Sequence, residues 1–295
     1  MGKIVRIGTR ESRLAVIQTQ IVADAIKRYH PEIEIMLVKM KTTGDKILDK
    51  TLDKMGGKGL FVKELDEALK RGDVDICVHS YKDMPAGDDP ELPVVAVSPR
   101  ADPRDVLILP REAESLSPEK PVGSSGKRRQ IQFKKLYPNQ AVAPVRGNVL
   151  TRLEKLDSGE FSALILAAAG IKRLGLWARV SRVFEPREML PAGCQGILAV
   201  QGRRGEDYGY LSAYNDKEAW VASIAERAYI KRLGCGCGAP AGVFCEGNGE
   251  ELRIRGMFSE DDENMRFGEI TGSRKDAAKL GAALAEKVMS GGGTL

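Results

Sequence analysis

Two cysteines one residue apart stand in a glycine-rich segment that reads Arg-Leu-Gly-Cys-Gly-Cys-Gly-Ala-Pro over residues 232–240. Glycine permits positive φ and close backbone approach, and Pro240 interrupts any regular element, so we expect a loop. Such a loop can hold the thiol of Cys235 or Cys237 at a cavity wall, with room beside it for a bulky group. The segment itself does not decide which thiol is used.

Zinc binding is the weaker interpretation of these thiols. Structural zinc sites usually carry Cys-x-x-Cys pairs, whereas this pair is Cys-x-Cys. The only histidines are His30 and His79, and both are distant in the sequence. We therefore predict no metal, and free thiols for all five cysteines, as in a reducing compartment.

A second candidate site is basic. The segment Gly-Ser-Ser-Gly-Lys-Arg-Arg covers residues 123–129, between a predicted strand and a predicted helix. Backbone N–H groups at a helix start, serine hydroxyls and the Arg128 and Arg129 guanidinium groups can all donate to an anion. The alternative is a capped helix with a solvated first turn, but basic residues are unfavourable at a helix N-terminus. We favour an anion site, for phosphate or for carboxylate.

The same arrangement recurs at Arg146-Gly147-Asn148, which follows a strand and opens a helix, with Arg152 one turn further on. Residues 119–152 hold eight basic residues and one acid, a field that attracts anions. Phe133 and Tyr137 are the only aromatic residues there, too few to stack single-stranded nucleic acid. A small polyanion is the better ligand class.

An acid follows a buried strand in the segment His-Ser-Tyr-Lys-Asp-Met-Pro at residues 79–85. Sheets of alternating α/β structure bind ligands at the carboxyl ends of their strands. Asp83 could act there as an acid–base group or stabilise a developing cation, and Arg10 ends the first strand at the same edge. A surface ion pair of Lys82 and Asp83 before a turn is an equal alternative on spacing alone.

A glycine-rich segment at residues 54–61 carries Lys54 and Lys58 and superficially resembles a phosphate loop. It lacks the Gly-x-x-x-x-Gly-Lys-Ser/Thr spacing, so nucleotide binding is poorly supported. We interpret this segment as a mobile glycine lid that carries two lysines.

The elements that must position these residues alternate between strand and helix. Strands are expected at 4–8, 33–40 and 74–78, with helices at 13–29, capped by Ser12, and at 59–69. This order predicts a largely parallel sheet covered by helices. A second set has strands near 106–109, 141–145 and 163–166 and helices at 127–136 and 148–156. The remainder has helices at 216–231 and 275–289 and strands at 243–244, 252–257 and 267–271.

Two proline-containing segments, 99–104 and 190–192, mark crossings between domains. We predict domain 1 from residues 1–98 and 197–214, domain 2 from 99–196 and domain 3 from 215–295. With 42% hydrophobic and 29% charged residues, the chain is long and apolar enough for two or three cores. It has no run long enough for a membrane span and no signal peptide, so we predict a cytoplasmic protein.

The ordered motifs resemble the porphobilinogen deaminase family, also called hydroxymethylbilane synthases, over essentially the whole chain. The matching segments are residues 8–12, 56–61, 79–85, 102–105, 128–130, 146–149, 169–175 and 225–227. The resemblance implies two α/β domains like those of type II periplasmic-binding proteins, plus a smaller α+β domain. It implies a transferase that joins four porphobilinogen molecules head to tail, releasing ammonia, to give hydroxymethylbilane. The chain would grow on a covalent dipyrromethane cofactor held through a cysteine thioether.

The resemblance also assigns roles to residues. Asp83 would be the catalytic carboxylate, facing pyrrole nitrogens and the cation formed when ammonia leaves. The cofactor would be bound by Cys237, Arg10, Ser12, Lys82, Asp83, Ser125, Arg128, Arg129, Arg146 and Gly147. Substrate carboxylates would be bound by Arg10, Arg146, Arg152, Arg173 and Gln195. Lys54, Lys58 and Phe61 fall on the family's active-site loop.

The family places its cofactor cysteine five residues after the arginine of Arg-Leu and three before the proline, and both counts reach Cys237. The chain departs from the family at Cys235 and Cys194, where glycine is usual. Neither departure affects Asp83 or the arginines, although a second thiol beside Cys237 could be oxidised or modified.

The resemblance further implies a monomer that passes its product to uroporphyrinogen-III synthase, with no nucleic acid or membrane partner. A two-lobed protein that binds or senses an anionic solute is the alternative. It would explain the anion sites but leave Asp83 and the Cys237 loop without a task.

Overall fold

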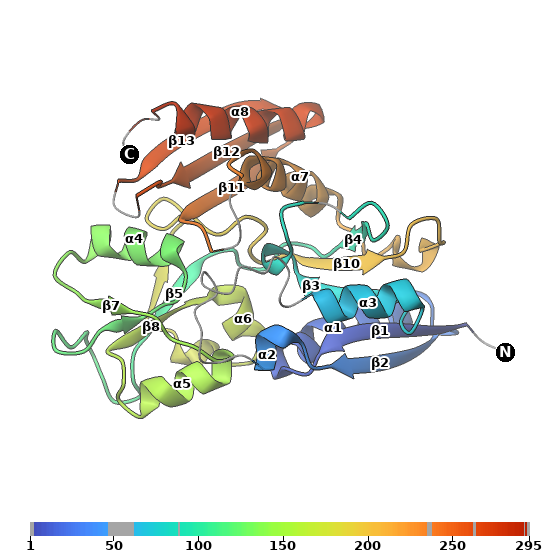
Figure 1. Cartoon of the computed structure of the whole chain (residues 1–295), viewed down its shortest axis with the longest axis horizontal. Helices are drawn as coiled ribbons and strands as arrows, with labels where there is room; N and C mark the ends of the chain where they lie inside the picture. Colours follow the sequence, from blue (N-terminus) through green and yellow to red (C-terminus); the bar gives the residue numbers. More distant parts are fainter. Residues whose placement is uncertain are drawn as a thin grey trace. The chain divides into compact units, whose positions relative to one another are not determined.

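A computed structural model describes residues 3–46, 62–87, 89–234, 238–261, 264–291 and 293 (Figure 1). Its contacts divide the chain into two compact units. The first consists of Met1–Ala101 and Ile197–Trp220, and the second of Asp102–Gly196 and Val221–Leu295. Among the described residues, no helix combines the length and the apolar character needed to cross a membrane.

The first unit contains a five-stranded sheet in the order β2-β1-β3-β10-β4. The strands are β1 (Ile4–Arg10), β2 (Glu34–Met40), β3 (Ile76–Ser80), β4 (Val94–Val97) and β10 (Leu198–Gly202). β1 pairs in parallel with β2 and β3, as expected from the alternating pattern. β10 is antiparallel to both β3 and β4, so the sheet is largely parallel, as predicted, with one reversed strand. β10 comes from a distant part of the chain, so the local alternation of strands and helices does not predict its direction.

Helices cover both faces of this sheet. α1 (Arg13–Tyr29) begins at Ser12, whose side chain accepts a hydrogen bond from the Ala15 N–H, as predicted. α1 packs on Ile76 and Val78 of β3, whereas α3 (Lys63–Arg71) packs on Cys77. Because successive side chains of a strand point to opposite faces, the two helices lie on opposite sides. The short α2 (Thr43–Lys46) follows β2.

The second unit contains a five-stranded sheet of the same design, in the order β7-β6-β8-β5-β9. β6 (Val122–Gly123) pairs in parallel with β7 (Val142–Ala143) and β8 (Ala163–Ala167). β5 (Asp105–Ile108) is antiparallel to β8 and to β9 (Arg182–Phe184). In each sheet the fourth position is therefore held by the one strand that runs against its neighbours. The helices here are α4 (Lys127–Leu136), α5 (Val149–Asp157) and α6 (Ala168–Arg173).

The C-terminal part of the second unit is a three-stranded antiparallel sheet in the order β11-β12-β13. The strands are β11 (Ala241–Asn248), β12 (Glu251–Phe258) and β13 (Arg266–Ser273). α7 (Lys217–Arg232) and α8 (Ala277–Met289) pack on one face, and Ile131 of α4 packs with Leu190 on the other (Figure 1). This sheet is thus covered on both sides.

The predicted fold class, two α/β lobes with a smaller α+β part, is confirmed by the two five-stranded sheets with their helices and the three-stranded C-terminal sheet. The predicted boundaries of the three domains stay a prediction. The C-terminal sheet counts with the second lobe in one compact unit because it packs on α4.

Candidate functional site

In the first unit, the predicted site residues gather at the carboxyl ends of β1 and β3. β1 ends at Arg10 and β3 at Ser80, and the parallel pairing of these strands brings both ends to one edge. Lys82 and Asp83 follow in a 3-10 turn, Tyr81–Asp83. The Asp83 side chain is exposed, while Arg10 and Lys82 are half-buried.

A buried glutamine supports this edge from the α1 side. The Gln18 amide nitrogen donates to the Ser80 hydroxyl at 2.9 Å, and the Ser80 hydroxyl lies 3.2 Å from Gln18 Oε1. Gln18 is 5% exposed, although it stands at a position of α1 where an apolar residue would be ordinary. This pair was not predicted from the sequence. A polar residue on the buried stripe of α1 was the available signal.

On the opposite face of β3, His79 is held in one tautomer. Gln201 of β10 donates its amide N–H to the Leu92 carbonyl at 3.0 Å, so its Oε1 must face His79 Nε2, which lies 3.1 Å away. His79 Nε2 therefore carries the proton. Burial lowers the pKa of His79 to about 4, and the nearby Arg10 charge also lowers it. The imidazole is neutral at pH 7.

In the second unit, the two predicted anion turns lie side by side. β6 and β7 are parallel neighbours, so the turns that follow them leave the same edge of the sheet. The Ser125 hydroxyl donates to the Val145 carbonyl at 2.5 Å and accepts from the Val145 N–H at 3.1 Å. Ser125 thus fixes the start of the Arg146-Gly147-Asn148 turn.

Each turn opens a helix in the predicted way. Asn148 caps α5 by accepting from the N–H groups of Leu150 and Thr151, and Gly147 has the left-handed φ of 106°. Arg152 folds back, with Nε donating to the Gly147 carbonyl at 2.8 Å. α4 begins at Gly126, which has no side chain to cap it.

Ser124 is one of the two serine donors expected in the segment at residues 123–129. Its side chain is 1% exposed, and its hydroxyl has no hydrogen-bond partner among the described residues. A buried hydroxyl without a partner is costly, so it indicates a ligand contact at the start of α4. Its place inside the Gly-Ser-Ser-Gly turn was the only sequence signal.

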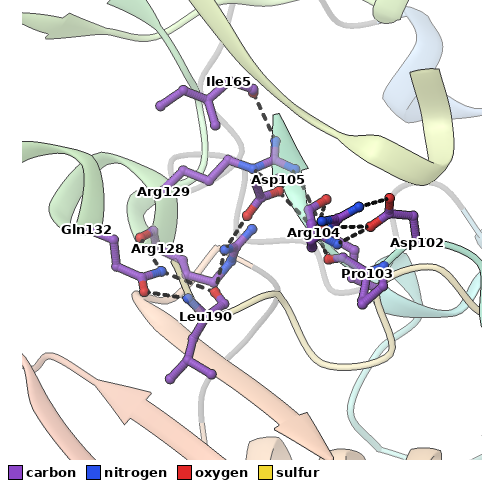
Figure 2. Close-up of polar contacts among 10 residues, drawn as sticks. Asp102, Pro103, Arg104, Asp105, Arg128, Arg129, Gln132, Ile165 and Leu190 are labelled. Carbon is purple, nitrogen blue, oxygen red and sulfur yellow. Dashed lines mark hydrogen bonds and ion pairs between the residues drawn. The ribbon is translucent and has the colours of Figure 1, made fainter. Parts of the chain in front are cut away.

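Arg128 and Arg129 share one buried acid, Asp105, which is 0% exposed (Figure 2). Arg128 Nη1 lies 2.7 Å from one Asp105 oxygen and 2.6 Å from the Leu190 carbonyl oxygen. Arg129 Nη2 lies 2.8 Å from the other Asp105 oxygen, and its Nη1 donates to the Ile165 carbonyl at 3.2 Å. Both arginines that are predicted to bind anions therefore also make hydrogen bonds and ion pairs within the protein.

The charges in this cluster are strongly coupled. Burial alone would raise the pKa of Asp105, but the two guanidinium groups outweigh it and hold that pKa well below its usual range. Burial also lowers the pKa of Arg128, against the attraction of Asp105. Two positive groups and one negative group leave a net charge of +1 at this place, so the cluster still attracts anions.

Gln195 and Arg173 join the same cluster through the turn that precedes β10. The Gln195 amide donates to the Pro103 carbonyl at 2.6 Å and lies 3.0 Å from Asp105 Oδ1. Arg173, at the end of α6, donates to the Gly196 carbonyl at 2.8 Å. Gln195 is thus a neighbour of the arginines, as its assignment to the site requires.

The remaining predicted residues lie outside the described part of the chain. These are Cys237 and its neighbour Cys235, and Lys54, Lys58 and Phe61 of the glycine-rich segment. The described cysteines, Cys77, Cys194 and Cys245, are buried free thiols. Within the described ranges, no group of three or more His, Cys, Asp or Glu side chains is placed to hold a metal ion.

Comparisons with known proteins agree over nearly the entire chain. Residues 5–209 match the family model "Porphobilinogen deaminase, dipyromethane cofactor binding domain", and residues 220–290 match "Porphobilinogen deaminase, C-terminal domain". A curated porphobilinogen deaminase of Acetivibrio thermocellus is 54% identical over 97% of this chain and 98% of its own length. One from Alkaliphilus oremlandii is 54% identical over 95% of both chains. These matches support no anion-sensing alternative, and the chain belongs to the porphobilinogen deaminase family, with a dipyrromethane cofactor-binding domain.

Proposed function

We propose that this enzyme joins four porphobilinogen molecules head to tail and releases the product as hydroxymethylbilane. Each coupling expels one ammonia, and water supplies the hydroxyl group of the released tetrapyrrole. The observation that carries this proposal is the match of residues 5–209 to the cofactor-binding domain, with Asp83 and the arginine turns inside it.

The donors around the start of α4 fit a dipyrromethane cofactor. Its pyrrole rings carry carboxylate side chains, and this place offers an uncapped helix start, the Ser124 hydroxyl and a cluster of net charge +1. When bound through Cys237, the cofactor would supply the nucleophilic pyrrole carbon to which the first substrate unit is added. Cys237 lies between α7 and β11 in the sequence.

Asp83 is the group that we assign to the chemistry. Its carboxylate is exposed at the sheet edge, on a short turn fixed at the end of β3. A carboxylate can stabilise the positive charge that develops on the substrate as ammonia leaves, and it can carry the proton that the coupled pyrrole loses. Neighbouring Lys82 would bind a carboxylate of the cofactor.

Some arginine nitrogens donate to groups within the protein, and we assign others to the carboxylates of the ligand. Arg128 can reach a ligand only through nitrogens other than Nη1, which already donates to Asp105 and Leu190. Arg146, Arg152 and Arg173 are half-buried and belong to the turns and helix end around the same sheet edge. Each added pyrrole brings two carboxylates, so several guanidinium groups are needed.

The substitution Asp83→Asn tests this function. We expect kcat for hydroxymethylbilane formation and ammonia release to fall about 10²–10⁴-fold, because the amide neither carries the proton nor offsets the cation. The cofactor adduct should remain, since Cys237 is intact. Asp24→Asn, which changes an exposed acid on α1, is the matched control. Near-normal turnover of Asp83→Asn would remove Asp83 from the mechanism.

We also propose that the protein acts as a monomer in the cytoplasm and that uroporphyrinogen-III synthase consumes its product. The support for these three proposals is indirect. The relatives' names and the predicted active-site motifs indicate the reaction, and the reaction suggests the location and the enzyme that consumes the product. Light scattering during size-exclusion chromatography tests the monomer, for which the sequence mass is 32.1 kDa. A stable dimer would contradict it.

A further inference from the structure

Glu226 is a fully buried acid on α7 that holds backbone groups from two separate segments. Its Oε2 accepts the N–H of Cys194 at 2.5 Å, and its Oε1 accepts the N–H of Cys245 at 2.8 Å. The side chain is 0% exposed. Both hydrogen bonds are buried within the protein, where losing an acceptor is costly. Glu226 therefore anchors the turn that contains Cys194 to α7 and β11.

The anchored turn has an unfavourable backbone conformation. Cys194 has a φ of 62°, and among the described residues it is the only non-glycine residue with positive φ. A side chain in this left-handed region clashes with its own backbone, which is why glycine is the usual residue there. Such a conformation persists only where the surrounding structure imposes it. Glu226 is the group that holds the Cys194 N–H in place.

The next two residues of this turn contact the anion-binding cluster. Gln195 Nε2 lies 3.0 Å from Asp105 Oδ1, the same oxygen that lies 2.8 Å from Arg129 Nη2. The Gly196 carbonyl accepts from Arg173 Nη2 at 2.8 Å. A change in the Cys194 backbone would therefore displace Gln195 and Gly196, and with them the partners of two arginines.

We propose that Glu226 is a positioning residue: by holding Cys194 in the left-handed conformation, it sets Gln195, Arg129 and Arg173 for binding carboxylates. Glu226 lies on α7, which leads into the segment that carries Cys237. One carboxylate thus links the helix before the cofactor cysteine to the arginines of the second lobe. The kinetic consequence rests on the proposed function, whereas the coupling between Glu226 and Cys194 does not.

A double-mutant cycle of Glu226→Gln and Cys194→Gly tests this proposal. Glu226→Gln replaces one accepting oxygen with an NH₂ group, so one of the two backbone N–H groups loses its acceptor. We expect KM for porphobilinogen to rise about tenfold, with kcat little changed, together with a lower midpoint of urea unfolding. Cys194→Gly alone should unfold at a higher urea concentration than Cys194→Ala, which keeps the Cβ, and should leave KM unchanged.

The decisive result is the combination. Glycine adopts positive φ without an anchor, so Cys194→Gly should reduce the effect of Glu226→Gln on both KM and the unfolding midpoint. Tyr229→Phe, three residues along α7 and also fully buried, is the control and should add independently to Cys194→Gly. If Glu226→Gln does not fold alone, Glu226→Asp takes its place in the cycle.

Strict additivity of the Glu226 and Cys194 changes, or a loss confined to kcat, would overturn the proposal. If the wild type makes no hydroxymethylbilane, the proposed function fails, while the unfolding coupling still decides whether Glu226 holds this turn.

Discussion

At the residue scale, Asp105 determines how the two adjacent arginines can be used. The Arg128-Arg129 pair at a helix start predicts ligand binding, and the structure adds a buried acid between them (Figure 2). Asp105 lies more than twenty residues earlier, and no spacing rule links it to the arginines. The residue types therefore predict the anion site, whereas Asp105 is identified as the buried partner only in the folded structure.

Replacing Asp105 with asparagine should destabilise the protein by about 3–5 kcal/mol, because removing one member of a buried ion pair leaves the other charges uncompensated. Urea unfolding monitored by circular dichroism at pH 7 measures this. Asp73→Asn removes a surface pair with Arg71 and should cost about 0–1 kcal/mol. An Asp105→Asn variant within about 1 kcal/mol of the wild type would show that the cluster does not depend on its acid.

At the element scale, segments with strong local signals were predicted well. α1 and α4 have the predicted bounds, because apolar periodicity and a Ser12 cap mark the first and a glycine turn precedes the second. β4, β6, β9 and β10 were not predicted. β6 and β9 are too short to show a period, and β10 is buried throughout, so only long-range pairing identifies it as a strand.

Two buried titratable groups of the first unit should have opposed effects on the pH dependence of stability. Burial lowers the pKa of His79 on β3 to about 4 from 6.5, so its contribution to stability is lost as pH falls from about 6.5 toward 4. Burial, with the charge of Asp89, raises the pKa of Asp66 on α3 to about 6 from 3.8. Its contribution is present at low pH and is lost as pH rises through this range.

Two variants separate these contributions. Relative to the wild type, the free energy of unfolding of Asp66→Asn should fall as pH decreases from 6.5 to 4.5. That of His79→Gln should rise over the same interval, because the variant has no imidazole to protonate in the unfolded state. Urea unfolding at several pH values measures both differences. Parallel curves for the wild type and either variant would contradict the corresponding pKa shift.

At the scale of the whole molecule, each lobe contains a five-stranded sheet whose fourth strand is antiparallel to its neighbours. Alternating strands and helices predicted two α/β lobes but not this reversed strand, since its pairing joins distant segments. The turns assigned to ligand binding were predicted from strand ends. Their supports Gln18 and Glu226 were not, because each acts through contacts that only the fold creates.

The central claim is that this fold holds a dipyrromethane cofactor on Cys237. Intact mass spectrometry of the full chain, purified from a porphyrin-making host, tests it most directly. We expect the wild type and Cys235→Ser to carry one adduct of two linked pyrrole units, and Cys237→Ser to have the bare sequence mass. An unmodified wild type, or an adduct that survives Cys237→Ser and is lost from Cys235→Ser, would contradict the claim.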